Sequence, residues 1–559
     1  MWATDGADCG YYLGTLGSTR PIGSDRLGSI RWHHSLQSAG TTASPDGTGR
    51  PRGRIALSRI RKVTLIEPQP PGFHVYSKFP LPRLGLPILG AILKQRGMDV
   101  SIYCQDFHPI DYADVLSSDL VGISTTTSTV PEAYRIARRV KEAGIPTVLG
   151  GSHVTFVPDE ALQYADYCVR GEGEHTFPEL IQAIECGAGF ESIKGLSYMA
   201  GGQAHHNPDR GLVQDLDALP FPDLSLIRGR EKIGISPVVT SRGCPYDCSF
   251  CSVTEMFGRA CRYRNPESVV EELSALEQKL VFFYDDNFAS RPRRTHELLE
   301  LMLSRGIDKY WSAQVRADVV RDRELIKLFQ KSNCWVLYIG FESASPETLA
   351  EYHKQQSVEE MVEAVRILHE HGILVHGMFV LGAESDTTRS IRQTVNFAMR
   401  NQIDTVQFMA LTPLPGTAYY HELERQDRLL TRDWQLYDGH HVVYQPREMT
   451  PYELQREAFR AMKCFYSLGQ CVRMLVGLDF VKFLAKLNVD LLKGKWSRAR
   501  WEVERRGRRW MYSAYGHFLI RRVEAASKEW TQALAKVTRR IQGIRDNLKP
   551  PPGKVEDNA

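Results

Sequence analysis

Short apolar strands alternate with helical segments in two long series, and this alternation constrains the fold of the chain more than any other feature. The first series spans residues 62–169 and the second 238–411. Such an alternation is typical of parallel sheets that are covered by helices on both faces. Ligands of these sheets bind beyond the carboxyl ends of the strands. The sequence therefore predicts two α/β units in which the residues after each strand carry the function.

The first series predicts a doubly wound parallel sheet. Its expected strands are Val63–Ile66, Asp99–Cys104, Leu120–Ser124, Pro146–Leu149 and Tyr167–Val169. Ser124 and Thr125 follow the third strand, and Gly150 and Gly151 follow the fourth. Because glycine has no side chain, the two glycines would let the backbone approach a large flat ligand. We expect these four residues to contact a ligand.

The second series predicts six strand–helix units. The expected strands are Val238–Ser241, Leu280–Tyr284, Tyr310–Val315, Trp335–Ile339, Val375–Leu381 and Thr405–Leu411. A β/α barrel places its chemistry at the carboxyl ends of the strands. The residues expected at these ends are Asp285, Asp286, Asn287, Arg316, Glu342, Gly382 and Glu384.

Three cysteines follow the first strand of the second series with the spacing C-x3-C-x2-C, at Cys244, Cys248 and Cys251. Four thiolates would complete the ligands of an iron–sulfur cluster, so three leave one iron free to bind another molecule. A structural zinc site or a disulfide pair are the alternatives. Zinc requires four ligands, and Cys261 lies ten residues beyond Cys251 with no histidine between them.

The remaining cysteines are scattered among a total of 11, an odd number. This is not a disulfide framework and indicates a reducing, cytoplasmic location. The most apolar long segment, Cys471–Leu492, is interrupted by charged residues, so no membrane-spanning helix is expected. Residues 1–60 lack the apolar core of a signal peptide and are expected to be disordered or to be a misassigned extension.

Positive charge is concentrated at the C-terminal end. From residue 451 onward the chain contains 23 Lys and Arg and 11 Asp and Glu, a net charge of +12. Residues 1–450 therefore carry a net charge of −8. Helices are expected at 452–467, 472–492 and 498–510. The arginines of 505–509 lie among aromatic residues, which suits an anionic membrane surface or a nucleic-acid backbone. The alternative is a helix face that packs on the second unit.

The cysteine segment up to Arg264 resembles the cluster motif of the radical S-adenosylmethionine (radical SAM) enzymes. Three motifs of the first unit resemble the cobalamin-binding domain that precedes many radical SAM cores. They are Arg83-Leu-Gly-Leu-Pro87, Gly150-Gly-Ser-His-Val154 and Val169-Arg-Gly-Glu-Gly-Glu174. The resemblance implies a cobalamin-binding domain at 61–200, a linker at 201–230 and a partial (β/α)6 radical SAM core at 231–447. A basic helical region at 448–548 and a disordered tail at 549–559 would follow.

The resemblance also implies a role for each candidate residue. Cys244, Cys248 and Cys251 would bind a [4Fe-4S] cluster, and Phe250 would lie beside the adenine of SAM. Residues 285–287, Arg316 and Glu342 occupy positions that contact the ammonium, carboxylate and ribose of SAM, and Gly382 and Glu384 belong to the segment that lines its adenine. Ser124, Thr125, Gly150 and Gly151 would contact cobalamin. Members with a protein ligand to cobalt carry Asp-x-His-x-x-Gly after the first strand; here Glu67–Gly72 has no histidine, so none is expected on the metal.

The implied activity is methyl transfer to an unactivated carbon through a 5′-deoxyadenosyl radical. A lipid or another small molecule is the expected substrate, and a flavodoxin or ferredoxin the expected reducing partner. Peripheral membrane contact through the basic helices is possible in this scheme, and no nucleic-acid partner is expected. The alternatives are a radical SAM cyclase that does not transfer methyl groups, a tRNA methylthiotransferase, which would need further N-terminal cluster cysteines, and a non-catalytic cobalamin or redox sensor.

Overall fold

The computed structural model describes residues 59–72, 81–476 and 478–547, which all belong to the unit Ala56–Ala559. The tail at 549–559 and nearly all of the predicted extension at 1–60 lie outside the described residues.

The first domain is built on a seven-stranded sheet with the order β2-β1-β3-β4-β5-β6-β7. Strands β1 to β5 are parallel, as predicted; they are Lys62–Glu67, Asp99–Cys104, Leu120–Thr125, Thr147–Gly151 and Tyr167–Val169. A hairpin of β6 (Leu196–Ala200) and β7 (Gln203–His206) extends the sheet with antiparallel pairing. This hairpin is not predicted from the sequence, and β7 falls within the expected linker, because the exposed polar residues of β7 show no apolar strand pattern.

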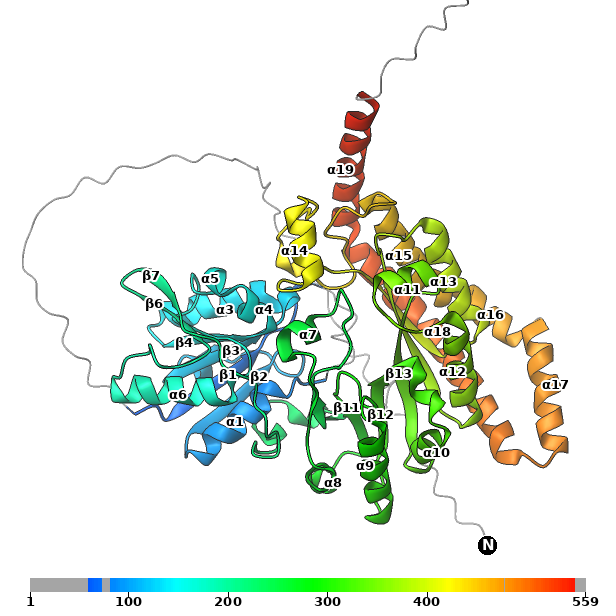
Figure 1. Ribbon diagram of the computed structural model, residues 1–559, viewed down its shortest axis with the longest axis horizontal. Coiled ribbons are helices and arrows are strands. Elements are labelled where there is room, and N and C mark those ends of the chain that lie inside the picture. The colour runs from blue at the N-terminus through cyan, green and yellow to red at the C-terminus, as the bar shows by residue number, and fades with distance from the viewer. Residues whose placement is uncertain (1–58, 73–80, 477, 548–559) are drawn as a thin grey trace, which may run out of the picture. The chain divides into compact units, whose positions relative to one another are not determined.

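Helices cover both faces of this sheet (Figure 1). Helices α1 (Gly85–Gln95) and α6 (Gly173–Cys186) bury Leu86, Leu93 and Phe177 in one core. Helix α3 (Val130–Glu142) packs on the other face in a separate core, with the short helices α2 (Tyr112–Val115), α4 (Ser152–Phe156) and α5 (Pro158–Ala161) nearby. The doubly wound architecture predicted from the alternating pattern is confirmed.

The second domain is a six-stranded parallel sheet with the order β15-β14-β13-β12-β11-β8. The strands are β8 (Ser236–Val238), β11 (Leu280–Phe283), β12 (Tyr310–Val315), β13 (Cys334–Glu342), β14 (Leu374–Leu381) and β15 (Thr405–Ala410). The first and last strands do not pair, so the barrel is open, as the (β/α)6 expectation requires. The connecting helices are α8 (Pro266–Ala275), α9 (Pro292–Ser304), α10 (Arg323–Lys331), α11 (Pro346–Glu351), α12 (Val358–Glu370) and α13 (Thr388–Arg400), and α14 (Ala418–Arg425) follows β15.

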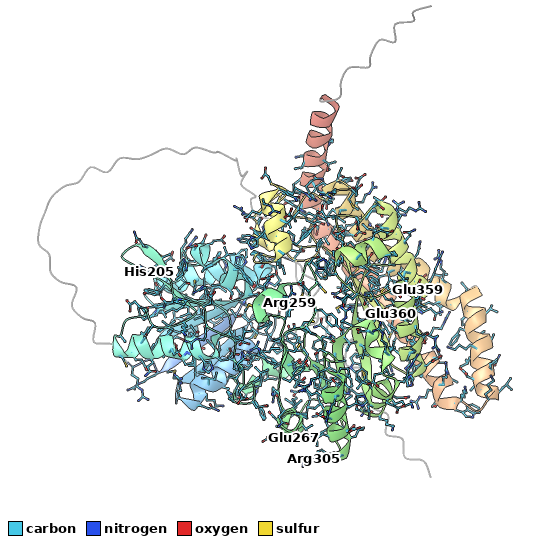
Figure 2. The ribbon with its side chains drawn as sticks, in the orientation of Figure 1. His205, Arg259, Glu267, Arg305, Glu359 and Glu360 are labelled. Atoms are coloured by element: carbon cyan, nitrogen blue, oxygen red, sulfur yellow. The ribbon has the colours of Figure 1, made fainter. Side chains whose placement is uncertain are left out.

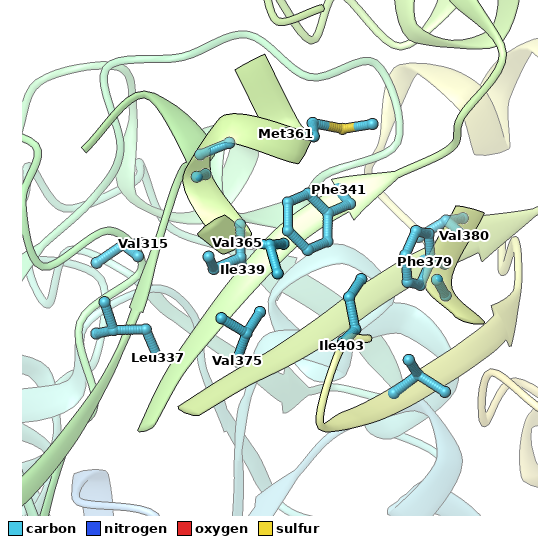
Figure 3. Close-up of a cluster of buried hydrophobic side chains, with 14 of the residues drawn as sticks. Val315, Leu337, Ile339, Phe341, Met361, Val365, Val375, Phe379, Val380 and Ile403 are labelled. Carbon is cyan, nitrogen blue, oxygen red and sulfur yellow. The ribbon is translucent and has the colours of Figure 1, made fainter. Parts of the chain in front are cut away.

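The core of the second domain lies between its strands and the outer helices (Figure 3). Phe341 of β13 and Phe379 of β14 have ring centroids 5.7 Å apart, and Met361 and Val365 of α12 pack in the same cluster. Apolar residues thus hold the strands rigidly, which fixes the loops at their carboxyl ends.

Five helices follow the barrel: α15 (Pro451–Phe465), α16 (Leu468–Leu475), α17 (Leu478–Leu492), α18 (Trp496–Ala526) and α19 (Lys528–Asn547). The predicted helix at 472–492 is therefore two helices. The one predicted at 498–510 ends only at Ala526, because Leu519, Ile520 and Val523 continue its buried face. In the described part of the chain, no helix is both long and apolar enough to cross a membrane.

The arginine cluster of α18 is partly buried. Arg505 donates to the carboxylate of Asp404 at 3.0 Å, next to β15, and Arg509 is also buried. Of the roles considered for the arginines at 505–509, packing on the second domain therefore accounts for at least Arg505.

Candidate active site

The three cysteines lie on a loop whose two ends are joined. Strand β9 (Ser241–Arg242) enters the loop, and β10 (Arg262–Tyr263) leaves it and pairs with β9 in antiparallel fashion. Gly243 has a φ of +91°, and a Cβ there would lie 2.9 Å from the carbonyl oxygen of Ala260. Glycine is therefore required directly before Cys244.

Two carboxylates at the end of β11 hold the start of this loop. Asp285 is fully buried and accepts hydrogen bonds from the backbone N–H and hydroxyl of Thr240, both at 2.6 Å. Asp286 accepts from the N–H of Gly243 at 3.0 Å. The SAM contact expected of these two residues stays a prediction, and the contacts that the structure shows position the cysteine loop. Asn287 is buried beside them.

The cysteine thiols lie close enough to influence one another. Burial, together with the nearby Cys248, Asp286 and Cys244, raises the pKa of Cys251 to about 12. Among the described residues no three Cys, His, Asp or Glu side chains converge on a single metal ion. In a cubane cluster each thiolate binds a different iron, and three cysteine ligands leave the fourth iron open.

A buried ion pair lies next to Cys248. Lys354 donates to the carboxylate of Glu342 at 2.7 Å, and both side chains are buried. Glu342 has a φ of +62°, an unfavourable conformation for a residue other than glycine that is often found at functional sites. A Cβ on Gly340 would lie 2.5 Å from Glu342 Oε1, so glycine leaves the room that the pair needs.

Arg316, at the end of β12, lies beside this pair. Its guanidinium donates to the carbonyl oxygen of Lys354 at 2.9 Å and packs over the ring of Tyr246 at 3.8 Å. Its buried Nε has no hydrogen-bond partner among the described residues, and the carboxylate of Asp318 lies 3.8 Å from it. An unsatisfied arginine donor beside the cysteine loop suits an incoming carboxylate. The sequence did not single out Lys354 or Tyr246, because neither directly follows a strand.

The other residues predicted to contact SAM, Phe250, Gly382 and Glu384, each contact a different part of the protein. Phe250 packs edge-on against Tyr352 at 4.7 Å. Gly382, with a φ of +110°, has its N–H bonded to Asp386. Glu384 binds Arg428 through both oxygens at 2.8 Å, so its carboxylate is already paired. Adenine binding by these residues stays a prediction.

A cavity of about 330 Å³ lies between the strand ends of the first domain and the cysteine loop of the second. Ser124, Gly150 and Gly151 line it, whereas Thr125 points elsewhere and donates to the carbonyl oxygen of Gly150 at 2.9 Å. The cavity continues between the sheet and helices α1 and α6, where a Cβ on Gly122 would lie 2.9 Å from Leu65. The second domain contributes Arg242, Met256, Phe257, Tyr284 and Asp286 among others.

Buried ion pairs join the two domains at the edge of this cavity. Arg242 donates to Glu172 at 2.8 Å and to Glu174 at 2.7 Å. Arg262, paired with Arg242 across the β9–β10 ribbon, also binds Glu172 at 2.8 Å. The motif at 169–174 is one of the three that resemble a cobalamin-binding domain, and its pairing with the cysteine loop was not anticipated.

The described residues that line the cavity include no histidine. His153 is instead buried beside Trp434, with ring centroids 5.0 Å apart, and His108 lies near the surface. His74 lies outside the described residues. The absence of a protein histidine ligand on the cobalt of cobalamin therefore stays a prediction.

Comparisons with known proteins agree with this geometry. Residues 238–398 match the Radical SAM superfamily, and 75–181 match the B12 binding domain. An uncharacterized methyltransferase of Pyrococcus horikoshii is 32% identical over 404 residues, which cover 69% of this chain and 88% of the relative. The chain belongs to the cobalamin-binding radical SAM enzymes.

Other members of this family are similar over comparable lengths. The hopanoid C-3 methylase of Methylococcus capsulatus is 29% identical and matches 72% of this chain and 80% of its own. The structure of the cobalamin-dependent radical SAM enzyme OxsB with aqua-cobalamin and SAM bound has a TM-score of 0.60 at 18% identity, over 79% of this chain and 72% of that one. TsrM from Kitasatospora setae, with cobalamin and a [4Fe-4S] cluster bound, has a TM-score of 0.57 at 21% identity, over 66% and 78%.

The cofactors of this radical SAM enzyme are thus a [4Fe-4S] cluster, SAM and cobalamin. The residues present fit all three. Cys244, Cys248 and Cys251 would hold the cluster, and the free donor of Arg316 suits the carboxylate of SAM. The glycine-lined cavity leaves space for cobalamin beside the same loop.

Proposed function

We propose that this enzyme transfers a methyl group to an unactivated carbon of a lipid or another apolar small molecule. The observation that carries the proposal is the shared cavity, which is lined both by the strand ends of the first domain and by the second-domain residues around the cysteine loop. When bound, the cluster supplies the electron that cleaves SAM to a 5′-deoxyadenosyl radical, and cobalamin carries the methyl group.

The chain's own residues bind and orient the cofactors, and they exclude water from the site. Asp285 and Asp286 hold the loop that carries the cysteines, and Arg316 offers its donor to SAM. The walls of the cavity include Leu84, Met256 and Phe257, which would keep water from a reactive carbon radical. The protein thus positions and shields the reactants, while the cofactors supply the bond chemistry.

An apolar substrate is supported by the relatives and by the cavity. One relative is named a hopanoid C-3 methylase, and another, from Chlorobaculum tepidum, a bacteriochlorophyllide d C-12(1)-methyltransferase, at 30% identity over 71% of this chain and 86% of the relative. We include in the proposal a one-electron donor such as a flavodoxin or ferredoxin, and contact with a membrane in which such a substrate would dissolve.

A ring-forming oxidation without methyl transfer is the second candidate. The anaerobic magnesium-protoporphyrin IX monomethyl ester cyclase of Cereibacter sphaeroides is 31% identical over 65% of this chain and 64% of its own. The chain is similar to methyltransferases and to this cyclase alike, and this similarity supports the second candidate.

The two candidates differ in what happens to the SAM methyl group. The reconstituted enzyme would be incubated anaerobically with dithionite, cobalamin, methyl-deuterated SAM and a lipid extract from a strain that lacks this gene. Methyl transfer predicts a lipid that gains a deuterated methyl group, together with S-adenosylhomocysteine. A product that loses hydrogen and gains no label would identify the cyclase-type reaction instead.

A further inference from the structure

Helix α16 presents an apolar stripe to solvent. Leu468, Val472 and Leu475 are spaced by four and three residues, so they lie on one face, and all three are exposed. An adjoining face of this helix is buried through Cys471 and Met474. The exposed stripe is therefore additional to the face that packs on the protein.

Helix α17 is apolar on two sides. Its inner side contacts α18, where Arg506 packs over the ring of Phe483 at 4.6 Å. Its outer side exposes Val481, Leu484 and Leu492, of which Val481 is 60% and Leu492 is 87% accessible. Contiguous apolar side chains that a helix leaves exposed mark a contact with a protein partner or a membrane. Trp496, at the start of α18, continues this surface and is 69% accessible.

The same region is positively charged. Residues 468–500 contain seven Lys and Arg against two Asp, a net charge of +5. A hollow of about 460 Å³ opens beside the apolar stripe of α16, between α13, α15 and α16. In the described chain, four basic side chains line it: Arg392, Arg460, Lys463 and Arg473. Arg392 and Arg460 pair with Glu457 at 2.9 and 3.5 Å, and Lys463 pairs with Glu524 at 2.7 Å.

We propose that the outer faces of α16 and α17, with Trp496, form a docking surface for a membrane that contains anionic phospholipid. Apolar side chains would enter the acyl boundary, Trp496 would lie at the headgroup level, and the basic hollow would take lipid phosphates. The described helices are too short or too polar to span, so this region lies on the membrane. Figure 1 shows α17 at the outer edge of the C-terminal helices, with α16 between it and α13.

The inference deepens the membrane contact included in the proposed function. It needs neither SAM cleavage nor a known substrate, because binding to lipid can be measured on protein that is not turning over. Docking and methyl transfer can therefore fail independently of each other.

Flotation of the purified full-length protein with vesicles tests the surface. We expect binding to phosphatidylcholine vesicles containing phosphatidylglycerol, and at least tenfold weaker binding to phosphatidylcholine alone or in high salt. The double variant Val481→Ser/Leu492→Ser should bind at least tenfold more weakly than the wild type. Its matched control is Met199→Ser/Leu303→Ser, which removes two exposed apolar side chains from β6 and α9 and should bind normally.

The charges are tested in the same assay. Arg473→Gln/Lys493→Gln should weaken binding to the anionic vesicles, whereas Arg305→Gln, at the end of α9 and away from α17 (Figure 2), should not. Because all of these side chains are exposed, the variants should keep the wild-type melting temperature. Equal binding by the wild type and the Val481/Leu492 variant would overturn the proposal. So would self-association through these helices without vesicle binding, which would assign the surface to a second copy of the chain.

Discussion

Arg242, two residues before the first cluster cysteine, donates to the carboxylate of Glu172 in the cobalamin-binding domain at 2.8 Å. Arg262, on the other strand of the β9–β10 ribbon, binds the same carboxylate. One buried acid of the first domain thus holds both ends of the loop that carries the cysteines. The relative position of the two cofactor sites is set by this contact and by the shared cavity wall.

Glu172→Gln should destabilise the enzyme strongly. The substitution removes the carboxylate that pairs with the buried guanidinium of Arg262, whereas Arg242 keeps its pair with Glu174. Breaking a buried pair costs about 3–5 kcal/mol of unfolding free energy. Glu297→Gln, which removes one side of an exposed pair with Arg293, is the matched control and should not change the denaturation midpoint. Urea denaturation measures both; a loss no larger than that of the control would show that the contact does not hold the domains.

Lys354→Met should weaken SAM binding at least tenfold while the cluster is retained. The substitution leaves the buried carboxylate of Glu342 without its cation, next to the free donor of Arg316. Equilibrium dialysis with SAM measures the binding, and the cluster absorbance reports its integrity. Lys327→Met, at an exposed pair with Glu324, should behave as the wild type. Normal SAM affinity in Lys354→Met would remove this pair from the SAM site.

Gly151→Ala and Gly150→Ala should separate folding from cobalamin binding. Gly151 has φ +99° and ψ −179°, a region that only glycine occupies freely, and a Cβ there would lie 2.3 Å from the carbonyl oxygen of Thr125. Its substitution should cost about 2 kcal/mol or more of stability without cofactor. A Cβ on Gly150 meets nothing closer than 3.5 Å, so that variant should fold normally and lose cobalamin affinity. Equal stability of the two cofactor-free variants would contradict this assignment.

Acid should weaken the fold through His153. Burial lowers the pKa of its imidazole to about 4, below the ordinary value of about 6.5 in the unfolded chain. The unfolded state therefore binds more protons between these values, and the contribution of His153 is complete above pH 6.5 and is lost as pH falls toward 4. The difference amounts to about 3 kcal/mol.

His153→Gln should accordingly lose less stability than the wild type between pH 7 and pH 4, as measured by chemical denaturation at each pH. His205→Gln, on the exposed strand β7 (Figure 2), is the control and should follow the wild type. A His153→Gln curve parallel to that of the wild type would contradict the burial argument.

The sequence predicts the strands and the cysteine loop better than it predicts the side-chain contacts that build the site. The apolar strands and the cysteine spacing are local patterns, and they place Cys244, Cys248 and Cys251 correctly at a strand end. Lys354 and Glu172 act through partners 12 and 70 residues away along the chain, which no local pattern reveals. The same limit explains Glu384, whose pairing with Arg428 across 44 residues appears only in the folded chain.

In the C-terminal helices, too, local sequence patterns did not predict the helix ends or which arginines are buried. The break between α16 and α17 falls inside an apolar run that reads as one helix, and the continuation of α18 to Ala526 depends on a face that packs against distant residues. Charge density alone did not distinguish Arg505, buried against Asp404, from basic residues that remain at the surface. Tertiary contacts decide each of these points.

The central claim is that the three cysteines hold a cluster that cleaves SAM beside cobalamin. Its most direct test is quantification of 5′-deoxyadenosine and S-adenosylhomocysteine after anaerobic reconstitution with dithionite, SAM and cobalamin, in the wild type, in Cys248→Ala and in the exposed-cysteine control Cys186→Ala. The account predicts 5′-deoxyadenosine from the wild type and Cys186→Ala, and none above background from Cys248→Ala. A wild-type enzyme with an intact cluster that forms no 5′-deoxyadenosine, or a Cys248→Ala variant that forms as much as the wild type, would contradict it.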